Sequence, residues 1–166
     1  MSGSRGVNPN TMGLNRTGLI LGTTSTYTTT VTVQGVINSK HVTGLTAQTN
    51  TATPITDAVT GVSFVAMIDD RATVLVFGQT LAGAIQMAQG SVVATVIGVT
   101  TTAGAFISAP QFPLIPDDFM VLGYCLVRTA PSAADFTAGT SSWTATGITT
   151  SQIIQCAALP NRPQTS

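Results

Sequence analysis

Charge is what this sequence has least of. Only 7% of its 166 residues are charged, glutamate is absent, and the formal net charge is zero, whereas about 25% of an ordinary soluble domain is charged. The acidic residues are Asp57, Asp69, Asp70, Asp117, Asp118 and Asp135, and the basic residues are Arg5, Arg16, Lys40, Arg71, Arg128 and Arg162. A freely soluble domain usually relies on net charge to prevent association. We therefore expect the surfaces of this chain to be covered by partners.

The scarcity of charge argues against two classes of partner. Phosphate binding needs a basic patch, and six scattered cations do not make one, so we expect no nucleic acid. Residues 72–116 carry no charge, but Gly, Gln and Thr interrupt every candidate 18-residue apolar run, so we expect no membrane partner. The first residues, Met1–Gly6, also lack the apolar region of a secretory signal.

Residues that could do chemistry are few. The only histidine, His41, follows Lys40, and no G-x-S-x-G nucleophile motif is present. Asp69-Asp70 and Asp117-Asp118 are adjacent pairs whose side chains point apart on an extended chain, which indicates turns and no acid–base couple. No loop has Ca²⁺-binding spacing. We expect no catalytic residue, metal, cofactor or small-molecule substrate, and hence no enzyme.

The two cysteines, Cys125 and Cys156, fit neither a disulfide framework nor a metal site. We interpret them as small buried residues on strands. A disulfide between them is the alternative if their strands are neighbours, although without a signal peptide we expect reduced thiols.

Threonine takes the place of charge as the polar residue, with 30 copies beside 16 Gly and 8 Pro. Threonine is β-branched, which disfavours helix and suits a pleated strand. The composition predicts an all-β fold, either a sandwich or a small barrel of the jelly-roll kind. We expect an extended N-terminal arm over residues 1–18, one β domain over 19–158 and a C-terminal tail over 159–166.

Apolar runs and period-2 alternation predict the strands. The predicted ranges are 18–22, 27–38, 41–47, 62–68, 72–78, 84–89, 92–99, 105–108, 119–129 and 149–157. Residues 62–78 read as a hairpin with a turn at 69–71, and residues 119–129 as a central strand. A helix over 81–89 is the alternative to the strand at 84–89, which we favour because Gly83 and Gly90 bracket only six residues.

Loops are expected over 48–61 and 131–146. We expect Tyr27, Tyr124 and Trp143 in the core; the alternative is an aromatic sugar-binding surface.

A resemblance emerges in the C-terminal half. Its motifs are Phe112–Asp118 (FPLIPDD), Leu122–Val127 (LGYCLV), Asp135–Thr140 (DFTAGT) and Ala145–Thr149 (ATGIT), with Val74–Gly78 and Gly83–Gly90 upstream. Together, over roughly residues 62–156, they resemble a domain common in virion proteins of tailed bacteriophages. Two positions depart from the family pattern: Asp118 stands where Gly is usual, and Trp143 where Leu is frequent.

The resemblance implies a capsid decoration (cement) or head-fibre protein, commonly trimeric and without catalytic residues. Its partner would be the major capsid protein on the capsid exterior, after assembly in the host cytoplasm. We expect the N-terminal arm to lie on that partner, with Arg5 and Arg16 pairing with acids of the shell. The alternative is a tail-fibre or receptor-binding subunit, with its recognition surface in loops 48–61 or 130–146.

Overall fold

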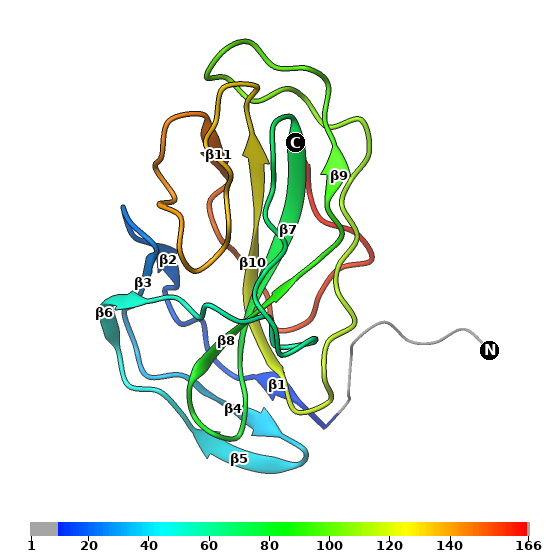
Figure 1. Ribbon diagram of the computed structural model, residues 1–166. Helices are drawn as coiled ribbons and strands as arrows, with labels where there is room; N and C mark the ends of the chain where they lie inside the picture. Colours follow the sequence, from blue (N-terminus) through cyan, green and yellow to red (C-terminus); the bar gives the residue numbers. More distant parts are fainter. Residues whose placement is uncertain (1–9, 166) are drawn as a thin grey trace, which may run out of the picture.

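The computed structural model describes residues 10–165, which form twelve strands and no helix. The strands make three antiparallel sheets that do not close into a barrel (Figure 1). The predicted all-β fold is therefore confirmed as a sandwich-like arrangement, and the small-barrel alternative is wrong.

The central sheet is built on two long strands, β7 (Arg71–Gln79) and β10 (Met120–Thr129), which pair along most of their length. On its outer side β7 pairs with β8 (Ile85–Gln89) and β9 (Val93–Ala94). On its other side β10 pairs with β11 (Ile148–Thr150) and β12 (Ile154–Gln155). The predicted central strand at 119–129 is confirmed, as is the strand, not the helix, at 84–89.

A β-bulge divides β10 into two parts. The register with β7 shifts between Val121 and Gly123, so that Leu122 is the extra residue. Side chains alternate along a strand with period two, and one inserted residue exchanges the two faces. Before the bulge the even-numbered Met120 faces the first core cluster, whereas beyond it the odd-numbered Cys125 does.

Both faces of the central sheet are buried, which explains why β7 and β10 are almost entirely apolar. The first face packs against the N-terminal half and the 130–147 loop through Leu19, Tyr27, Ile37, Phe136 and Trp143. The second face packs against extended segments without regular structure. These contribute Phe106, Phe112, Ile115, Cys156 and Leu159.

Two small sheets flank this core at the left and bottom of Figure 1. One contains β1 (Met12–Gly13), β4 (Gln34–Ile37) and β5 (Lys40–Thr43); the other contains β2 (Ile20–Leu21), β3 (Thr26–Thr29) and β6 (Gln48–Ala52). The single strand predicted over 27–38 is wrong, because β3 and β4 belong to different sheets. The loop predicted over 48–61 is wrong at its start, where β6 forms.

The predicted hairpin over 62–78 is wrong. Residues 62–68 form only isolated bridges, such as Met67 with Phe136, and do not pair with β7. Phe64 and Met67, three residues apart, are the buried positions, a spacing that departs from the period of two in a strand. Apolar composition alone could not distinguish this covering segment from a ladder strand.

The remaining predicted strands are shorter than expected. The run at 92–99 reduces to β9, the run at 105–108 to a bridge between Thr95 and Phe106, and the run at 149–157 to β11 and β12.

Part of the predicted N-terminal arm contacts the rest of the chain. Its residues 1–9 lie outside the described residues, but β1 pairs with β4 and the Leu14 amide donates to the Gln34 carbonyl at 2.9 Å. In the C-terminal tail, Pro163 is buried and the Gln164 amide donates to the Tyr124 hydroxyl at 3.3 Å.

Candidate interaction surfaces

Within residues 10–165 the structure places His41 on a strand and the paired aspartates Asp69-Asp70 and Asp117-Asp118 in turns. His41 is exposed on β5 opposite Val36. Asp70 has a left-handed backbone (φ 53°), and its Oδ1 accepts the Gly98 amide at 2.8 Å, as a turn residue would. Within residues 10–165 no group of three His, Cys, Asp or Glu could hold a metal ion. The same residues include no helix that could cross a membrane.

The two cysteines lie on opposite faces of the central sheet and are free thiols. Cys125 belongs to the first core cluster, whereas Cys156 packs against the second. Burial raises the pKa of Cys125 to about 12 and that of Cys156 to about 11. Both thiols are therefore protonated at neutral pH, when a thiol is a poor nucleophile.

The three aromatic residues considered for sugar binding are in the core, as predicted. Tyr27, Tyr124 and Trp143 are all at most 3% exposed. The Trp143 indole donates from Nε1 to the Thr26 carbonyl at 3.0 Å, and its ring lies 5.5 Å from that of Phe136. The Phe136 and Trp143 rings hold residues 130–147 on the core, and none of Tyr27, Tyr124 and Trp143 is exposed enough to form an aromatic platform.

Asp57 has a structural role that the sequence analysis missed, since it assigned this residue only to a loop. Its buried carboxylate accepts the Val59 and Thr60 amides at 2.7 and 3.1 Å and the Gln89 amide at 2.9 Å. The first two bonds form a side-chain turn that Asp commonly makes. The bond from Gln89 holds residues 57–58 alongside β8. These residues therefore cover that edge of the central sheet.

The first candidate surface is an apolar ridge formed by Val62, Val65 and Ile68, which are 53–63% exposed. The three residues are spaced three apart, and the buried Phe64 and Met67 lie between them in the chain. The three exposed side chains therefore project outward from one covering segment. Exposed aliphatic residues that gather in this way are typical of interaction sites.

The backbone of the apolar ridge is fixed at its middle and at its last residue. The Gln89 amide group accepts the Val65 N–H at 2.7 Å and donates to the Val65 carbonyl at 3.0 Å. The Thr129 hydroxyl donates to the Ile68 carbonyl at 2.6 Å. A surface held in this way loses little freedom when it binds.

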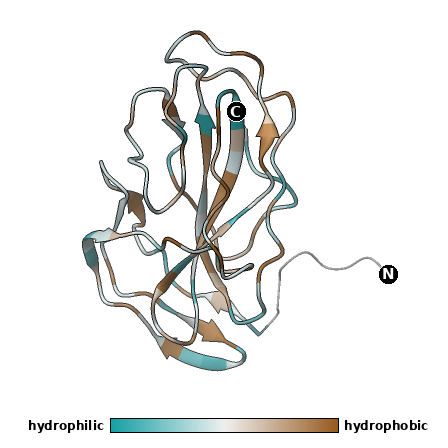
Figure 2. Ribbon diagram, viewed as in Figure 1, coloured by the Kyte–Doolittle hydropathy of each residue, from teal (hydrophilic) through white to brown (hydrophobic). Residues whose placement is uncertain are grey.

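The second candidate surface is the hairpin of residues 95–106, which extends beyond β9. The Val96 amide donates to the Ala105 carbonyl, and Val99 and Thr102 exchange two hydrogen bonds around its turn. Val96, Ile97 and Val99 are 52–79% exposed. Figure 2 shows these brown, apolar stretches in the outer loops at the top of the molecule.

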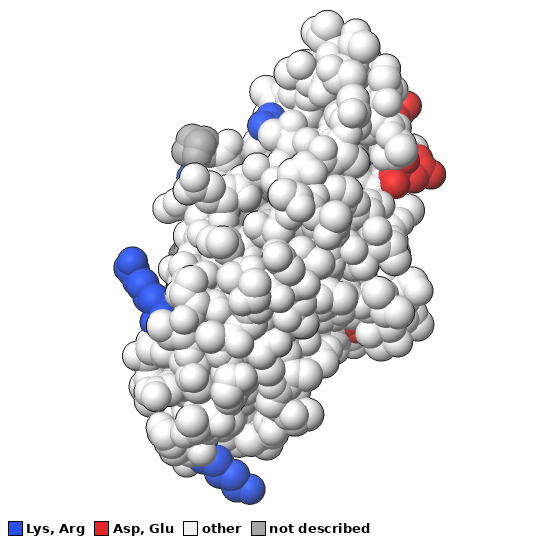
Figure 3. Space-filling model, turned by 90° about the vertical axis from the view of Figure 1, so that its left-hand side faces the viewer, with Lys and Arg blue, Asp and Glu red and all other residues white. Residues whose placement is uncertain are grey.

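Charge is sparse and unevenly placed. The face seen in Figure 3 is almost wholly uncharged; the cations visible in this view lie toward one edge and the bottom, and the visible carboxylates lie mainly at the opposite edge. Such a separation makes the two edges complementary to each other.

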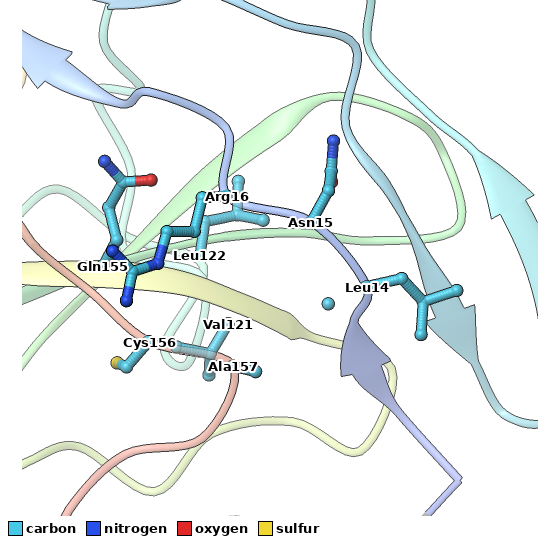
Figure 4. Close-up of a pocket in the computed structure, with 9 residues that line it drawn as sticks. Leu14, Asn15, Arg16, Val121, Leu122, Gln155, Cys156 and Ala157 are labelled. Carbon is cyan, nitrogen blue, oxygen red and sulfur yellow. The ribbon is translucent and has the colours of Figure 1, made fainter.

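The third candidate surface is a groove of about 290 Å³, here called the Arg16 groove. Its walls are residues 13–16 and 155–157, and its floor is Val121 and Leu122 at the β10 bulge (Figure 4). The Gly18 amide donates to Gln155 Oε1 at 3.1 Å and joins the two walls. Arg16, the one charged residue of the lining, is exposed.

No protein-family model matches this chain, and neither a curated protein nor a solved structure matches it.

Proposed function

We propose that the chain is a structural virion protein of a tailed bacteriophage, a capsid decoration protein that binds and stabilises the head shell as a homo-oligomer, by expectation a trimer. It is assembled in the host cytoplasm, lies on the capsid exterior, and has the major capsid protein as its partner. In this proposal it is no enzyme and uses no cofactor. The motifs of the C-terminal half support the phage assignment.

The observation that carries the proposal is the exposure of aliphatic side chains on a nearly uncharged, rigid surface. The apolar ridge and the 95–106 hairpin together expose six Val and Ile residues by more than half. Covering a half-exposed side chain of this size contributes about 1 kcal/mol. Several such residues on each subunit suit a permanent assembly, since obligate interfaces are the more apolar ones.

In this function the subunits associate through apolar faces and lie across junctions between shell subunits. A decoration subunit that binds only the intact shell stabilises the shell by mass action. Its binding free energy is lost when the shell dissociates, so binding opposes dissociation. The uncharged Thr-rich surface lowers the cost of removing water from these contacts, since no unpaired charge is buried.

Localisation on the particle tests the proposal. Gold-labelled antibodies against the recombinant chain are applied to purified virions of the phage whose genome encodes it. We expect labelling of the head exterior, and heads that lack the protein should release DNA at a lower temperature than decorated heads. Absence of the protein from purified virions would overturn the proposal.

A tail-fibre or receptor-binding subunit is the second candidate. The observation in its favour is the 95–106 hairpin, whose exposed Ile97 and Val99 could contact a receptor directly. Labelling of the tail together with adsorption of the isolated protein to host cells would select it over the decoration protein.

A further inference from the structure

One end of the apolar ridge carries an exposed carboxylate. Asp69 directly follows Ile68, and both are exposed. Within the described residues Asp69 has neither a hydrogen bond nor an ion pair. An exposed aliphatic side chain therefore stands next to an unengaged negative charge, on a backbone fixed by the Thr129 hydroxyl.

The other carboxylates lack this combination. Asp57 is buried and accepts three amides, and Asp70 Oδ1 is bonded to the Gly98 amide. Asp117 already interacts with another group of the chain, and Asp118 is partly buried. Asp135 is exposed but stands between Ala134 and the buried Phe136. Of the six carboxylates, Asp69 is the one that directly follows an exposed large aliphatic residue in the chain.

The Arg16 groove has the complementary chemistry. No carboxylate belongs to its lining, and the Arg16 guanidinium has no partner within residues 10–165. Because Gln155 Oε1 accepts the Gly18 amide, the orientation of its amide group is set, and its Nε2 is a further donor. Leu14, 54% exposed, adds an apolar side chain to the lining.

Figure 4 shows the Arg16 and Gln155 side chains on the same side of the groove, with Leu14 apart from them. The raised pKa of Cys156 keeps that thiol uncharged, so nothing in the lining offsets the positive charge of Arg16. A carboxylate next to an aliphatic side chain is the ligand that this arrangement fits.

The two complementary features cannot meet within one chain. Ile68 and Arg71 are bonded to Thr129 at the end of β10, whereas Val121 and Leu122, the floor of the groove, lie near its beginning. Eight residues of strand separate these positions by about 25 Å.

We infer that Ile68 and Asp69 of one copy dock in the Arg16 groove of the next copy. Asp69 pairs with Arg16 and the Gln155 amide, and Ile68 packs against Leu14. The inference rests on the proposed homo-oligomer and names the surfaces that build it. The contact is heterologous, so repetition closes a ring if the rotation between copies permits, as a trimer requires.

A charge exchange tests the contact. Arg16→Asp, Asp69→Arg and the double variant are compared with the wild type by light scattering after size-exclusion chromatography, over a series of concentrations. We expect each single variant to associate about tenfold more weakly or worse, since it opposes like charges in the contact. The association of the double variant should be within about threefold of the wild type in strength, because the charge pair is restored with its signs reversed.

Matched controls are Lys40→Asp and Arg162→Asp, which reverse exposed charges outside both surfaces. They should associate like the wild type, and circular dichroism and urea midpoints should show that every variant folds. An oligomer that the single variants leave intact, or that the controls weaken equally, would overturn the inference while the proposed function stands. A wild type that is monomeric at every concentration would overturn the inference and the oligomeric part of the proposed function together.

Discussion

The hydroxyl of Thr129 joins the end of β10 to the chain that enters β7, 58 to 61 residues earlier. It accepts the Arg71 amide at 3.0 Å and donates to the Ile68 carbonyl at 2.6 Å, and the residue is fully buried. One side chain therefore satisfies a backbone group of the first residue of β7 and one of the covering segment before it, and it positions Ile68.

Replacement of Thr129 by Val keeps the shape of the side chain and removes the hydroxyl. We expect the free energy of unfolding to fall by about 2 kcal/mol, because buried backbone groups lose their partners. Urea unfolding measures the change. Thr129→Ser, which keeps the hydroxyl and loses one methyl group, should be the less destabilised of the two. The reverse order would show that packing, and not the hydrogen bonds, holds this position.

Trp143 is the only tryptophan, and its indole bonds the 130–147 loop to β3. Trp143→Phe should cost about 1 kcal/mol from the lost hydrogen bond and more from the smaller ring. Trp143→Ala should cost about 3–5 kcal/mol because it also leaves a large cavity. Thermal unfolding followed by circular dichroism gives both values. Equal stability of the three proteins would mean that the loop does not depend on this anchor.

Gly123 allows β12 and the residue before it to approach the β10 bulge. A Cβ at this position would lie 2.8 Å from the Ile154 carbonyl oxygen and 2.9 Å from the Ile153 side chain. Gly123→Ala should therefore destabilise the fold by about 1–3 kcal/mol, as overpacking does. Gly13→Ala is the control, since its Cβ would meet only the Val121 carbonyl oxygen, at an ordinary 3.5 Å. Urea midpoints compare them, and a similar loss for both would contradict this account.

Stability should fall at alkaline pH because of Cys125. Burial raises the pKa of its thiol from 9.0 to about 12, so the unfolded chain releases the proton first. The stabilisation is complete below pH 9 and is lost as the pH rises toward 12, at about 1.4 kcal/mol per pH unit at most.

Urea unfolding at pH 8, 9 and 10 measures this slope, and Cys125→Ala provides the control. The variant should be less stable throughout but should depend less on pH. Burial also raises the pKa values of Tyr27 and Tyr124 above 10.0, so the comparison is sharpest at pH 10 and below. Parallel curves for the two proteins would exclude Cys125 as the cause.

For the candidate surfaces the sequence gives only expectations. It predicts that Arg16 pairs with acids of the shell and that weakly charged surfaces are covered by partners, and both stay predictions. The Arg16 groove was not predictable, because its floor comes from residues 121–122 and its far wall from residues 155–157. Asp69 was interpreted only as a turn residue, since nothing in a sequence shows that Ile68 beside it is exposed.

The sequence by itself determined the β class and the buried pair of long strands. Threonine and the other β-branched residues suit a pleated backbone, and the apolar run at 119–129 is continuous because both faces of β10 are covered. Only the tertiary structure decided which apolar segments joined the sheet. Val62–Ile68 and Val74–Phe77 are similar in composition, yet the first covers the sheet and the second lies within it, because pairing depends on which backbone groups find partners across the fold. The same long-range placement put Asp69 and Arg16 at opposite ends of β10.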